Sequence, residues 1–327
     1  PSHPLARESG LLLADIDHRH GRLDLAATRL ERLLVEAHEA PWRFRASLDL
    51  GMVRLAQGDV ERAERHLTVA RETPDSAVFL AALNGLGDVR MFVGDLEGAE
   101  RWYHNVQVLS QEDGLERTDQ AMTPAEAYAT YQVGRIQLLR GQPEAAATTF
   151  DRTRRLARPP LADDASLSLA LAYIHRREEA RASAVLETIR RTQPGAPPAS
   201  RAAYYLALLA LAEGRGDEAR RFCEEAIAGA PHSGEGVEAA LLLAELEAAH
   251  GQLAQAADSL RAQFGQPGLP IHLRGKLAKR LGEFAQRSGD YAQAIQWYER
   301  TAQAAPALRG EMAYRLAVEE TPFIQQI

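Results

Sequence analysis

The side chains that could carry out covalent or metal chemistry are few in this 327-residue chain. Its one cysteine, Cys223, could act as a nucleophile, and His18 and His20 could bind a metal ion. Cys223 stands where equivalent segments of the chain carry Leu, Tyr or Phe, which favours a place in the core. His18 and His20 lie two positions apart on an expected helix, so their side chains cannot easily face one ion. The sequence therefore predicts neither a nucleophile nor a metal site.

No nucleotide-binding or acyl-transfer motif stands out either. Gly85 and Gly87 have the spacing of glycines in a nucleotide loop, but they fall inside a predicted helix, where small residues serve packing. The chain has no phosphate-binding loop and no Gly-x-Ser-x-Gly elbow. We therefore expect no enzymatic activity, no cofactor and no catalytic residue.

What remains is a set of polar and aromatic side chains near the middle of the chain. Seven residues make up this candidate partner-binding groove: Asn84, Asp88, Tyr128, Tyr131, Arg135, Arg201 and Tyr204. Tyr and Arg are the side chains found most often as binding anchors. Because a guanidinium suits a carboxylate and an amide can pair with a peptide backbone, the set indicates an extended peptide with an acidic group. The alternative, that the tyrosines pack between helices, stays open.

An internal repeat predicts the elements that position these side chains. Eight reference positions recur at separations of 34 to 47 residues, and seven of them are glycine: Gly21, Gly58, Gly94, Gly141, His175, Gly214, Gly251 and Gly289. Five residues after each stands an alanine: Ala26, Ala63, Ala99, Ala146, Ala180, Ala219, Ala256 and Ala294. A small residue stands seven positions before each reference, and a mostly apolar residue nine positions after it.

This pattern is typical of a helical hairpin in each repeat. The glycine ends the first helix, since a left-handed backbone is easy for glycine. The small residue and the alanine let the two helices approach closely. The groove residues stand six, ten or thirteen positions before a reference, on one face of the first helix of each hairpin.

The segment from Gly289 to Arg300 closely resembles the tetratricopeptide repeat consensus, and so do Gly94 to Tyr103 and Gly58 to Leu67. The resemblance covers about Leu5 to about Pro306 and is weakest around His175, where the glycine is missing. It implies an all-α, right-handed superhelical solenoid of about eight helix-turn-helix hairpins with a concave groove. The lengthened repeats also resemble those of bacterial signalling proteins, including large transcription activators of the maltose-regulator type.

The resemblance also excludes one kind of partner. Family members that hold the C-terminal carboxylates of chaperones carry a Lys/Asn clamp in this groove. Asn84 matches one part of the clamp, but Asp88 stands at the partner position and would repel a carboxylate. We therefore do not expect a chaperone C-terminus as the ligand.

The repeats divide the chain into an array over residues 1–306 and a capping helix with a tail over residues 307–327. Within the array, an acidic insertion lies near residues 110–124, and the pattern is irregular near residues 158–199. A surface loop is the simpler interpretation of the insertion, and a partner contact is the alternative.

Charge and composition limit the partners. The net charge is −7 and basic residues are spread along the chain, which argues against nucleic acid. No apolar stretch approaches the roughly 20 residues that cross a bilayer, so we expect no membrane insertion. A single cysteine fits a reducing compartment and favours the cytoplasm. The chain begins at Pro1, which we take as a sign of a longer protein, so a periplasmic location stays open.

Two functions compete on these grounds. The first is a non-enzymatic scaffold that binds a protein or peptide in the concave groove. The second is a ligand- or peptide-sensing regulatory module of a larger bacterial signalling or transcription-regulator protein. The sequence predicts neither the partner's identity nor the oligomeric state.

Overall fold

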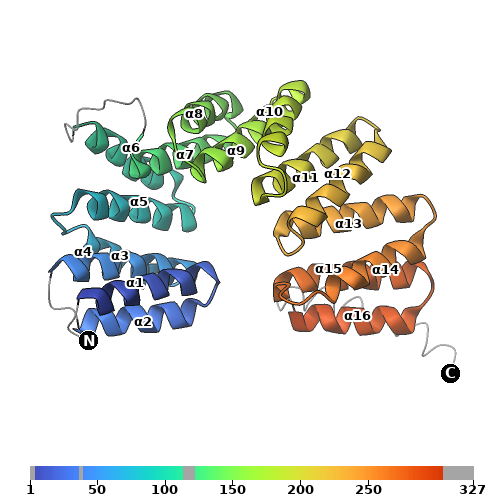
Figure 1. Ribbon diagram of the computed structural model, residues 1–327, viewed down its shortest axis with the longest axis horizontal. Coiled ribbons are helices and arrows are strands. Elements are labelled where there is room, and N and C mark those ends of the chain that lie inside the picture. The colour runs from blue at the N-terminus through green and yellow to red at the C-terminus, as the bar shows by residue number, and fades with distance from the viewer. Residues whose placement is uncertain (1–3, 37–39, 113–121, 305–327) are drawn as a thin grey trace. The chain divides into compact units, whose positions relative to one another are not determined.

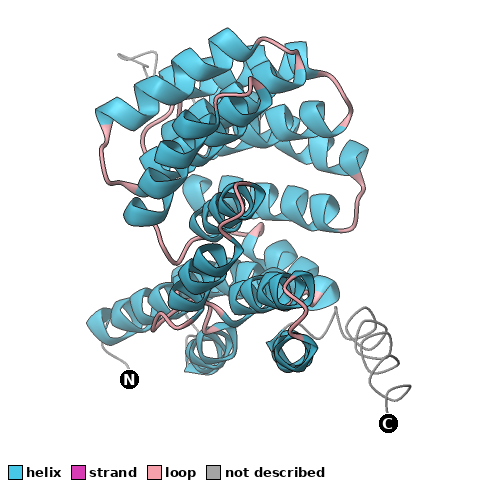
Figure 2. Cartoon of the chain, turned by 90° about the vertical axis from the view of Figure 1, so that its right-hand side faces the viewer, coloured by secondary structure: helices cyan, strands magenta, loops and turns pink. Residues whose placement is uncertain are grey.

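The computed structural model describes residues 4–36, 40–112 and 122–304, and within them the chain forms helices and no strands (Figures 1 and 2). The helices are α1 (Pro4–Arg19), α2 (Leu23–Glu36), α3 (Ala40–Ala56), α4 (Val60–Ala70), α5 (Ser76–Phe92), α6 (Leu96–Glu112), α7 (Pro124–Leu139), α8 (Pro143–Leu156), α9 (Leu161–His175), α10 (Glu179–Thr192), α11 (Pro197–Ala212), α12 (Gly216–Gly229), α13 (Gly234–Ala249), α14 (Leu253–Phe264), α15 (Ile271–Arg287) and α16 (Tyr291–Ala304). The all-α prediction is confirmed, with eight hairpins in the described residues. The predicted capping helix over residues 307–327 and most of the acidic insertion lie outside those residues.

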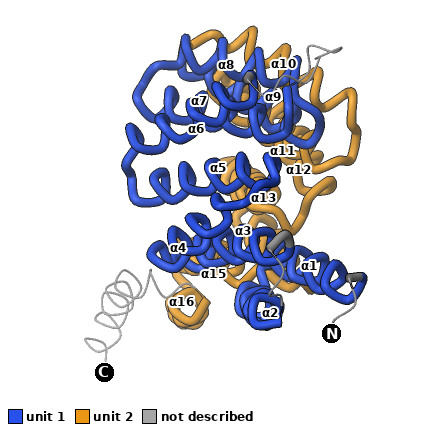
Figure 3. The backbone as a smooth tube through the Cα atoms, turned by 90° about the vertical axis from the view of Figure 1, so that its left-hand side faces the viewer, with its two compact units in different colours: residues 1–176 blue, residues 177–327 orange. Residues whose placement is uncertain are grey.

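The chain divides into two compact units, Pro1–Arg176 and Arg177–Ile327 (Figure 3). In the first unit, the first helices of successive hairpins contact one another in the order α1, α3, α5, α7 and α9. In the second unit, α11, α13 and α15 contact one another in the same way. The first helices of each unit are therefore stacked side by side. One face of each first helix contributes to a common surface of the stack.

The turn within each hairpin depends on a left-handed residue. All seven reference glycines have a positive φ, between 70° and 81°. In the fifth hairpin the residue with positive φ is Arg177, at 57°, and not His175, which is the last residue of α9. The fifth reference position is therefore Arg177, and the alignment on His175 was wrong by two residues.

Burial confirms the shifted register of the fifth hairpin. Ala180 is exposed, whereas Ala182, five residues after Arg177, is fully buried. Leu186, nine residues after Arg177, and Ala170, seven residues before it, are also fully buried. Arg177 stands 36 residues after Gly141 and 37 before Gly214, so this repeat is as regular as its neighbours. Without a glycine at the turn, the sequence offered no marker for this register.

Small and large residues face each other where the two helices of a hairpin cross. A Cβ atom added to Gly87 would lie 2.5 Å from Tyr103 Cε1, and one added to Gly134 would lie 2.6 Å from Phe150 Cε1. Some hairpins with Leu on the second helix carry Ala in place of Gly, as Ala244 with Leu260 does. The residue seven positions before the reference and the one nine positions after it therefore fill a common space. This close packing explains why the repeat pattern has a small residue at the first of these positions.

Aspartates begin several of the second helices. Asp59 accepts a hydrogen bond from the Arg62 amide at 3.1 Å, and Asp95 accepts one from the Gly98 amide at 2.8 Å. Such caps satisfy an amide that the helix leaves without a partner. The short turn and the cap together fix where each second helix starts, and so the register of the packed pair.

Candidate functional site

A cavity of the first unit, with a volume of about 1000 Å³, lies among the first helices of its second, third and fourth hairpins. Its walls come from α3, α5 and α7, with further residues from the end of α6 and from the connection after α8. Six lining residues stand six, ten or thirteen positions before a reference glycine: Leu48, Met52, Ala81, Asn84, Asp88 and Tyr128. Their role in binding a partner stays a prediction.

The carboxylate of Asp88 is the centre of a hydrogen-bond network at this cavity. Tyr103 Oη donates to Asp88 Oδ1 at 2.6 Å, and Tyr128 Oη lies 3.0 Å from Oδ1 and 2.9 Å from Oδ2. Gln132 Nε2 donates to Asp88 Oδ1 at 3.0 Å and also to Tyr128 Oη at 2.6 Å. Three helices therefore hold this carboxylate in a fixed position: α5, α6 and α7.

Burial dominates the electrostatics of the network. Burial raises the pKa of Asp88 above its ordinary value, although the bonds from Tyr103, Tyr128 and Gln132 and the charge of Arg135 act in the opposite direction. Burial and the neighbouring Asp88 also raise the pKa of both tyrosines. Both phenols therefore stay protonated at neutral pH and keep donating to the carboxylate.

Asn84 lies one helical turn before Asp88 and also lines the cavity. Its Nδ2 donates to the backbone oxygen of Ala125 at 3.0 Å, which ties α5 to the start of α7. This bond fixes the orientation of the amide, so Oδ1 is the atom that remains for another donor. Oδ1 is buried and has no hydrogen-bond partner in the described part of the chain.

Two further charged residues line the cavity. Asp49, on α3, lies 3.4 Å from Arg45 Nε, and burial raises the pKa of its carboxyl despite that arginine. Arg158, in the connection between α8 and α9, is exposed to solvent. Apolar side chains such as Leu80 and Met122 cover much of the remaining wall. The cavity thus combines an apolar surface with a small number of polar groups, as ligand sites commonly do.

Two of the predicted groove residues on α7 lie outside the cavity lining. The ring of Tyr131 packs 5.6 Å from the ring of Phe150, and its hydroxyl lies 3.2 Å from Ser168 Oγ. These contacts match the alternative in which a tyrosine packs between helices. Arg135 is exposed, and its Nη1 donates to Gln132 Oε1 at 2.8 Å. Arg135 therefore reaches the Asp88 network through Gln132.

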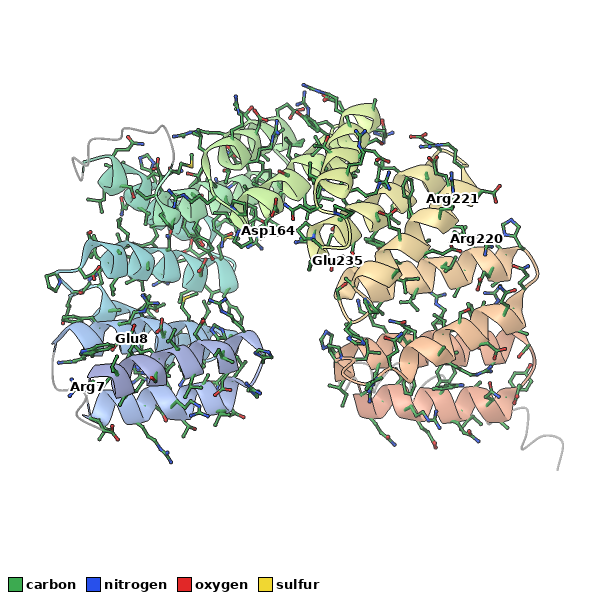
Figure 4. All side chains as sticks on the ribbon, viewed as in Figure 1. Arg7, Glu8, Asp164, Arg220, Arg221 and Glu235 are labelled. Atoms are coloured by element: carbon green, nitrogen blue, oxygen red, sulfur yellow. The ribbon has the colours of Figure 1, made fainter. Side chains whose placement is uncertain are left out.

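The other two predicted residues lie on α11, in the second unit. Arg201 Nε lies 3.0 Å from Glu235 Oε1. Glu235 lies at the start of α13 (Figure 4). The ring of Tyr204 lies 5.4 Å from that of Tyr205 and packs against the buried cluster around Ala203 and Cys223. The described structure therefore joins Asn84, Asp88 and Tyr128 at one cavity and gives Arg201 and Tyr204 contacts of their own.

Sequence reasoning missed three residues of the site. Tyr103 and Gln132 hold Asp88, and Asp49 lines the cavity. Gln132 follows Tyr128 by four residues on the same helix face, so helical spacing could have revealed it. Tyr103 was identified only as an apolar position of the repeat, because its ring fills the hairpin while its hydroxyl reaches Asp88.

Cys223 and His20, two of the isolated candidates for chemistry, have contacts within the chain. Cys223 is fully buried, and burial raises the pKa of its thiol to about 12, so the thiol is protonated at neutral pH. The ring Nδ1 of His20 lies 2.8 Å from the backbone oxygen of Ile16. Within the described ranges, no group of three or more His, Cys, Asp or Glu side chains is arranged to hold a metal ion. None of the helices in those ranges has the length and apolar character needed to span a bilayer.

Comparison with known families identifies the repeat. Residues 11–77, 131–197 and 180–234 match a family described as Tetratricopeptide repeat, and residues 277–311 match a second family with the same description. These segments cover more than half of the chain. One of them, residues 131–197, runs across Arg177, the left-handed residue of the fifth hairpin. No curated protein matches the chain.

Solved structures with the same fold have low sequence identity. Yeast Tom70 superimposes with a TM-score of 0.72 at 14% identity over 99% of this chain, which spans 65% of the Tom70 chain. A Rap protein in complex with Competence and Sporulation Factor gives a TM-score of 0.55 at 14% identity, covering 98% of this chain and 89% of that one. A tetratricopeptide repeat protein from Parabacteroides merdae gives a TM-score of 0.52 at 16% identity, covering 85% of this chain and 99% of that one. At these identities, the similarity shows the fold alone.

Proposed function

Since the chain belongs to the tetratricopeptide repeat family, we propose that it is a non-enzymatic scaffold that holds a protein or peptide partner in the cavity of its first unit. The observation that carries this proposal is the cavity itself. It has about 1000 Å³ of space among α3, α5 and α7, and its lining includes side chains from the predicted inner face of each. First helices of stacked repeats commonly present such a surface to a partner.

The cavity has the chemistry of a binding site. An aromatic side chain with a polar tip, Tyr128, adjoins apolar groups from α3 and α5. The network around Asp88 fixes Tyr128 in place before a partner arrives, and this preorganisation lowers the entropy lost on binding. The Rap protein of the same fold, solved with Competence and Sporulation Factor, gives a precedent for a solenoid of this kind that holds a factor.

We propose that the partner surface extends beyond the cavity to the other predicted groove residues. Tyr131 and Arg135 continue along α7 from Tyr128, and Arg201 and Tyr204 form a separate contact surface on α11 of the second unit. Of these four residues, Arg135 is exposed, so Arg135→Ala tests the extension without disturbing the core.

A variant that fills the mouth of the cavity tests the proposal. Ala77 lines the cavity near the start of α5 and is exposed, so Ala77→Trp adds bulk there without overpacking the core. The cap of α5 is unaffected, because the Ala77 backbone amide donates to Asp75 Oδ1. Peptides selected from a random display library on the full chain should bind Ala77→Trp at least about tenfold more weakly, a loss of about 1.4 kcal/mol.

The matched control is Ala180→Trp, which adds the same bulk at an exposed alanine on α10. This variant should bind the selected peptides with unchanged affinity. Circular dichroism should show that both variants keep their helix content. Equal binding by wild type and Ala77→Trp would exclude the cavity as the partner site.

The size of the cavity favours a second candidate function, a sensor module that takes a small ligand. A volume of about 1000 Å³ is at the upper end of the range of small-molecule sites. Such a module would form part of a larger bacterial signalling or transcription-regulator protein. Binding of a small metabolite that Ala77→Trp abolishes, together with no selection of peptides, would favour this candidate.

A further inference from the structure

The polar atoms that the cavity still offers to a ligand are hydrogen-bond acceptors. Asp88 Oδ1 accepts from Tyr103, Tyr128 and Gln132, whereas among the described residues Oδ2 accepts only from Tyr128. A carboxylate oxygen has room for a further donor. Asn84 Oδ1 is buried, 5% of the residue is exposed, and no described residue donates to it. A buried acceptor without a donor is costly, so a ligand that brings a donor is favoured.

The charges around the cavity are also complementary to a cation. Two carboxylates line it, Asp49 and Asp88, against one guanidinium, that of Arg158. Arg158 is exposed, so solvent screens its charge, whereas Asp88 is largely buried. All the hydrogen bonds that Asp88 accepts in the described residues come from neutral groups. The nearby cation that acts on it, Arg135, is exposed and donates to Gln132.

The apolar walls suit the stem of a long side chain. Leu48 and Met52 on α3 and Leu80 on α5 line the same cavity as the acceptors. Lys and Arg commonly lay their methylene groups along such a surface while the charged end reaches a polar group. An acidic side chain would bring its charge to Asp88 without a donor, and an aliphatic one would leave Asn84 Oδ1 without a partner.

We propose that the cavity takes a lysine or arginine side chain of the partner, whose N–H groups donate to Asp88 and to Asn84 Oδ1. The proposal rests on the proposed function, since it names the chemistry that the same cavity selects. It differs from the acidic peptide that Arg135 suggested in the sequence, because Arg135 does not line the cavity. The raised pKa of Asp88 supports it, since a cation that arrives beside a buried carboxylate favours the ionised form.

The test uses three pools of short peptides built from uncharged residues, with one fixed central position. That position is Lys or Arg in the first pool, Glu in the second and norleucine in the third. Binding to the full chain is measured by fluorescence anisotropy. The basic pool should bind at least about tenfold more tightly than either of the other two pools.

Two variants assign the preference to the cavity. Asp88→Asn keeps the shape of the side chain and removes its charge, and should reduce binding of the basic pool about tenfold while leaving the norleucine pool unchanged. Arg158→Ala removes the exposed lining cation and should strengthen binding of the basic pool. Arg155→Ala is the control, because Arg155 is also exposed, near the end of α8, and does not line the cavity.

The outcomes separate the two proposals. Preference for the glutamate or norleucine pool, with binding abolished by Ala77→Trp, would overturn the basic side chain and leave the cavity as the partner site. Binding of no pool, or binding that Ala77→Trp leaves unchanged, would overturn both. If Asp88→Asn loses its helix content, the test rests on Arg158→Ala. Arg158→Ala and Arg155→Ala binding the basic pool with equal affinity would then contradict the inference.

Discussion

Asp17 and Asp88 are carboxylates of the first unit whose surroundings shift their pKa values in opposite directions. Burial tends to raise the pKa of both. For Asp17, the bonds and charges of Arg29 and Arg22 outweigh burial, with the nearest nitrogen of each 2.7 Å from the carboxylate, and the pKa is lowered. For Asp88, the neutral donors and the more distant Arg135 do not outweigh burial, and the pKa is raised. The difference follows from the partners: two guanidinium groups in one case, two phenols and an amide in the other.

The two aspartates should therefore make opposite contributions to stability as pH changes. With a folded pKa below its unfolded value, Asp17 stabilises the protein above the ordinary value of 3.8, and this stability is lost as pH falls through the folded pKa. With a raised folded pKa, Asp88 disfavours folding as pH rises above 3.8. In thermal melts, Asp17→Asn should lower the melting temperature more at pH 7 than at pH 3. The melting temperature of Asp88→Asn, relative to that of wild type, should be higher at pH 7 than at pH 4.

The residue scale is also where sequence reasoning found part of the site and missed the rest. Counting back from Gly94 and Gly141 identified Asn84, Asp88 and Tyr128, because a helix keeps a fixed register from its end. The same counting selected Tyr131, which packs on Phe150 outside the cavity. Which neighbouring side chain fills a gap depends on how two helices cross, and one sequence does not contain that information.

At the scale of the hairpin, the packing of a glycine against an aromatic ring gives a stability prediction. Gly134→Ala places a methyl group 2.6 Å from Phe150 Cε1 if nothing moves, so we expect overpacking to lower the free energy of unfolding by about 1–3 kcal/mol. Phe150→Leu in the same chain should restore part of that loss, since Ala244 with Leu260 is the natural pair of the seventh hairpin. Denaturant melts of both single variants and the double variant measure the coupling. If the changes in the free energy of unfolding of the two single variants simply add up in the double variant, the two side chains do not occupy a common volume.

The turn of the fifth hairpin gives a second prediction at this scale. Arg177 has φ of 57°, a conformation that costs a residue with a side chain free energy that glycine avoids. Arg177→Gly should therefore raise the free energy of unfolding by about 1 kcal/mol. Gly141→Ala, at the equivalent turn of the fourth hairpin with φ of 70°, should lower it by a similar amount. Chemical denaturation would show both effects, and destabilisation by Arg177→Gly would indicate that the arginine side chain stabilises the turn.

The elements themselves were the most predictable part of the molecule. Seven hairpins follow from a small residue, a glycine and an alanine at fixed spacing, and each of their second helices buries the expected alanine. The fifth hairpin was placed two residues too early because Ala180 fits the pattern as well as Ala182 does. Only burial distinguishes the two alanines, and burial depends on the neighbouring hairpins.

At the scale of the whole molecule, each of the two units is built from contacts that are local in sequence. In the described residues of each unit, contacts between helices join a helix to the next one or to the one after it. Stability in such an array is transmitted between neighbours, so a local change should have a local effect. We expect Gly134→Ala to speed backbone hydrogen exchange in α7 and α8 more than in α15 and α16. Uniform acceleration along the chain, measured by mass spectrometry, would instead indicate one cooperative unit.

The pairing of small and large residues inside each hairpin has a consequence for how such chains change over generations. Because Gly87 meets Tyr103, and Gly282 meets Tyr298, within one stretch of sequence, a duplicated stretch would inherit both halves of its own fit. An array of this design can therefore lengthen or shorten by whole hairpins without new compensating mutations at the crossing. Asp88, in contrast, draws its donors from two hairpins, so inheritance of this site requires the third and fourth hairpins to stay adjacent.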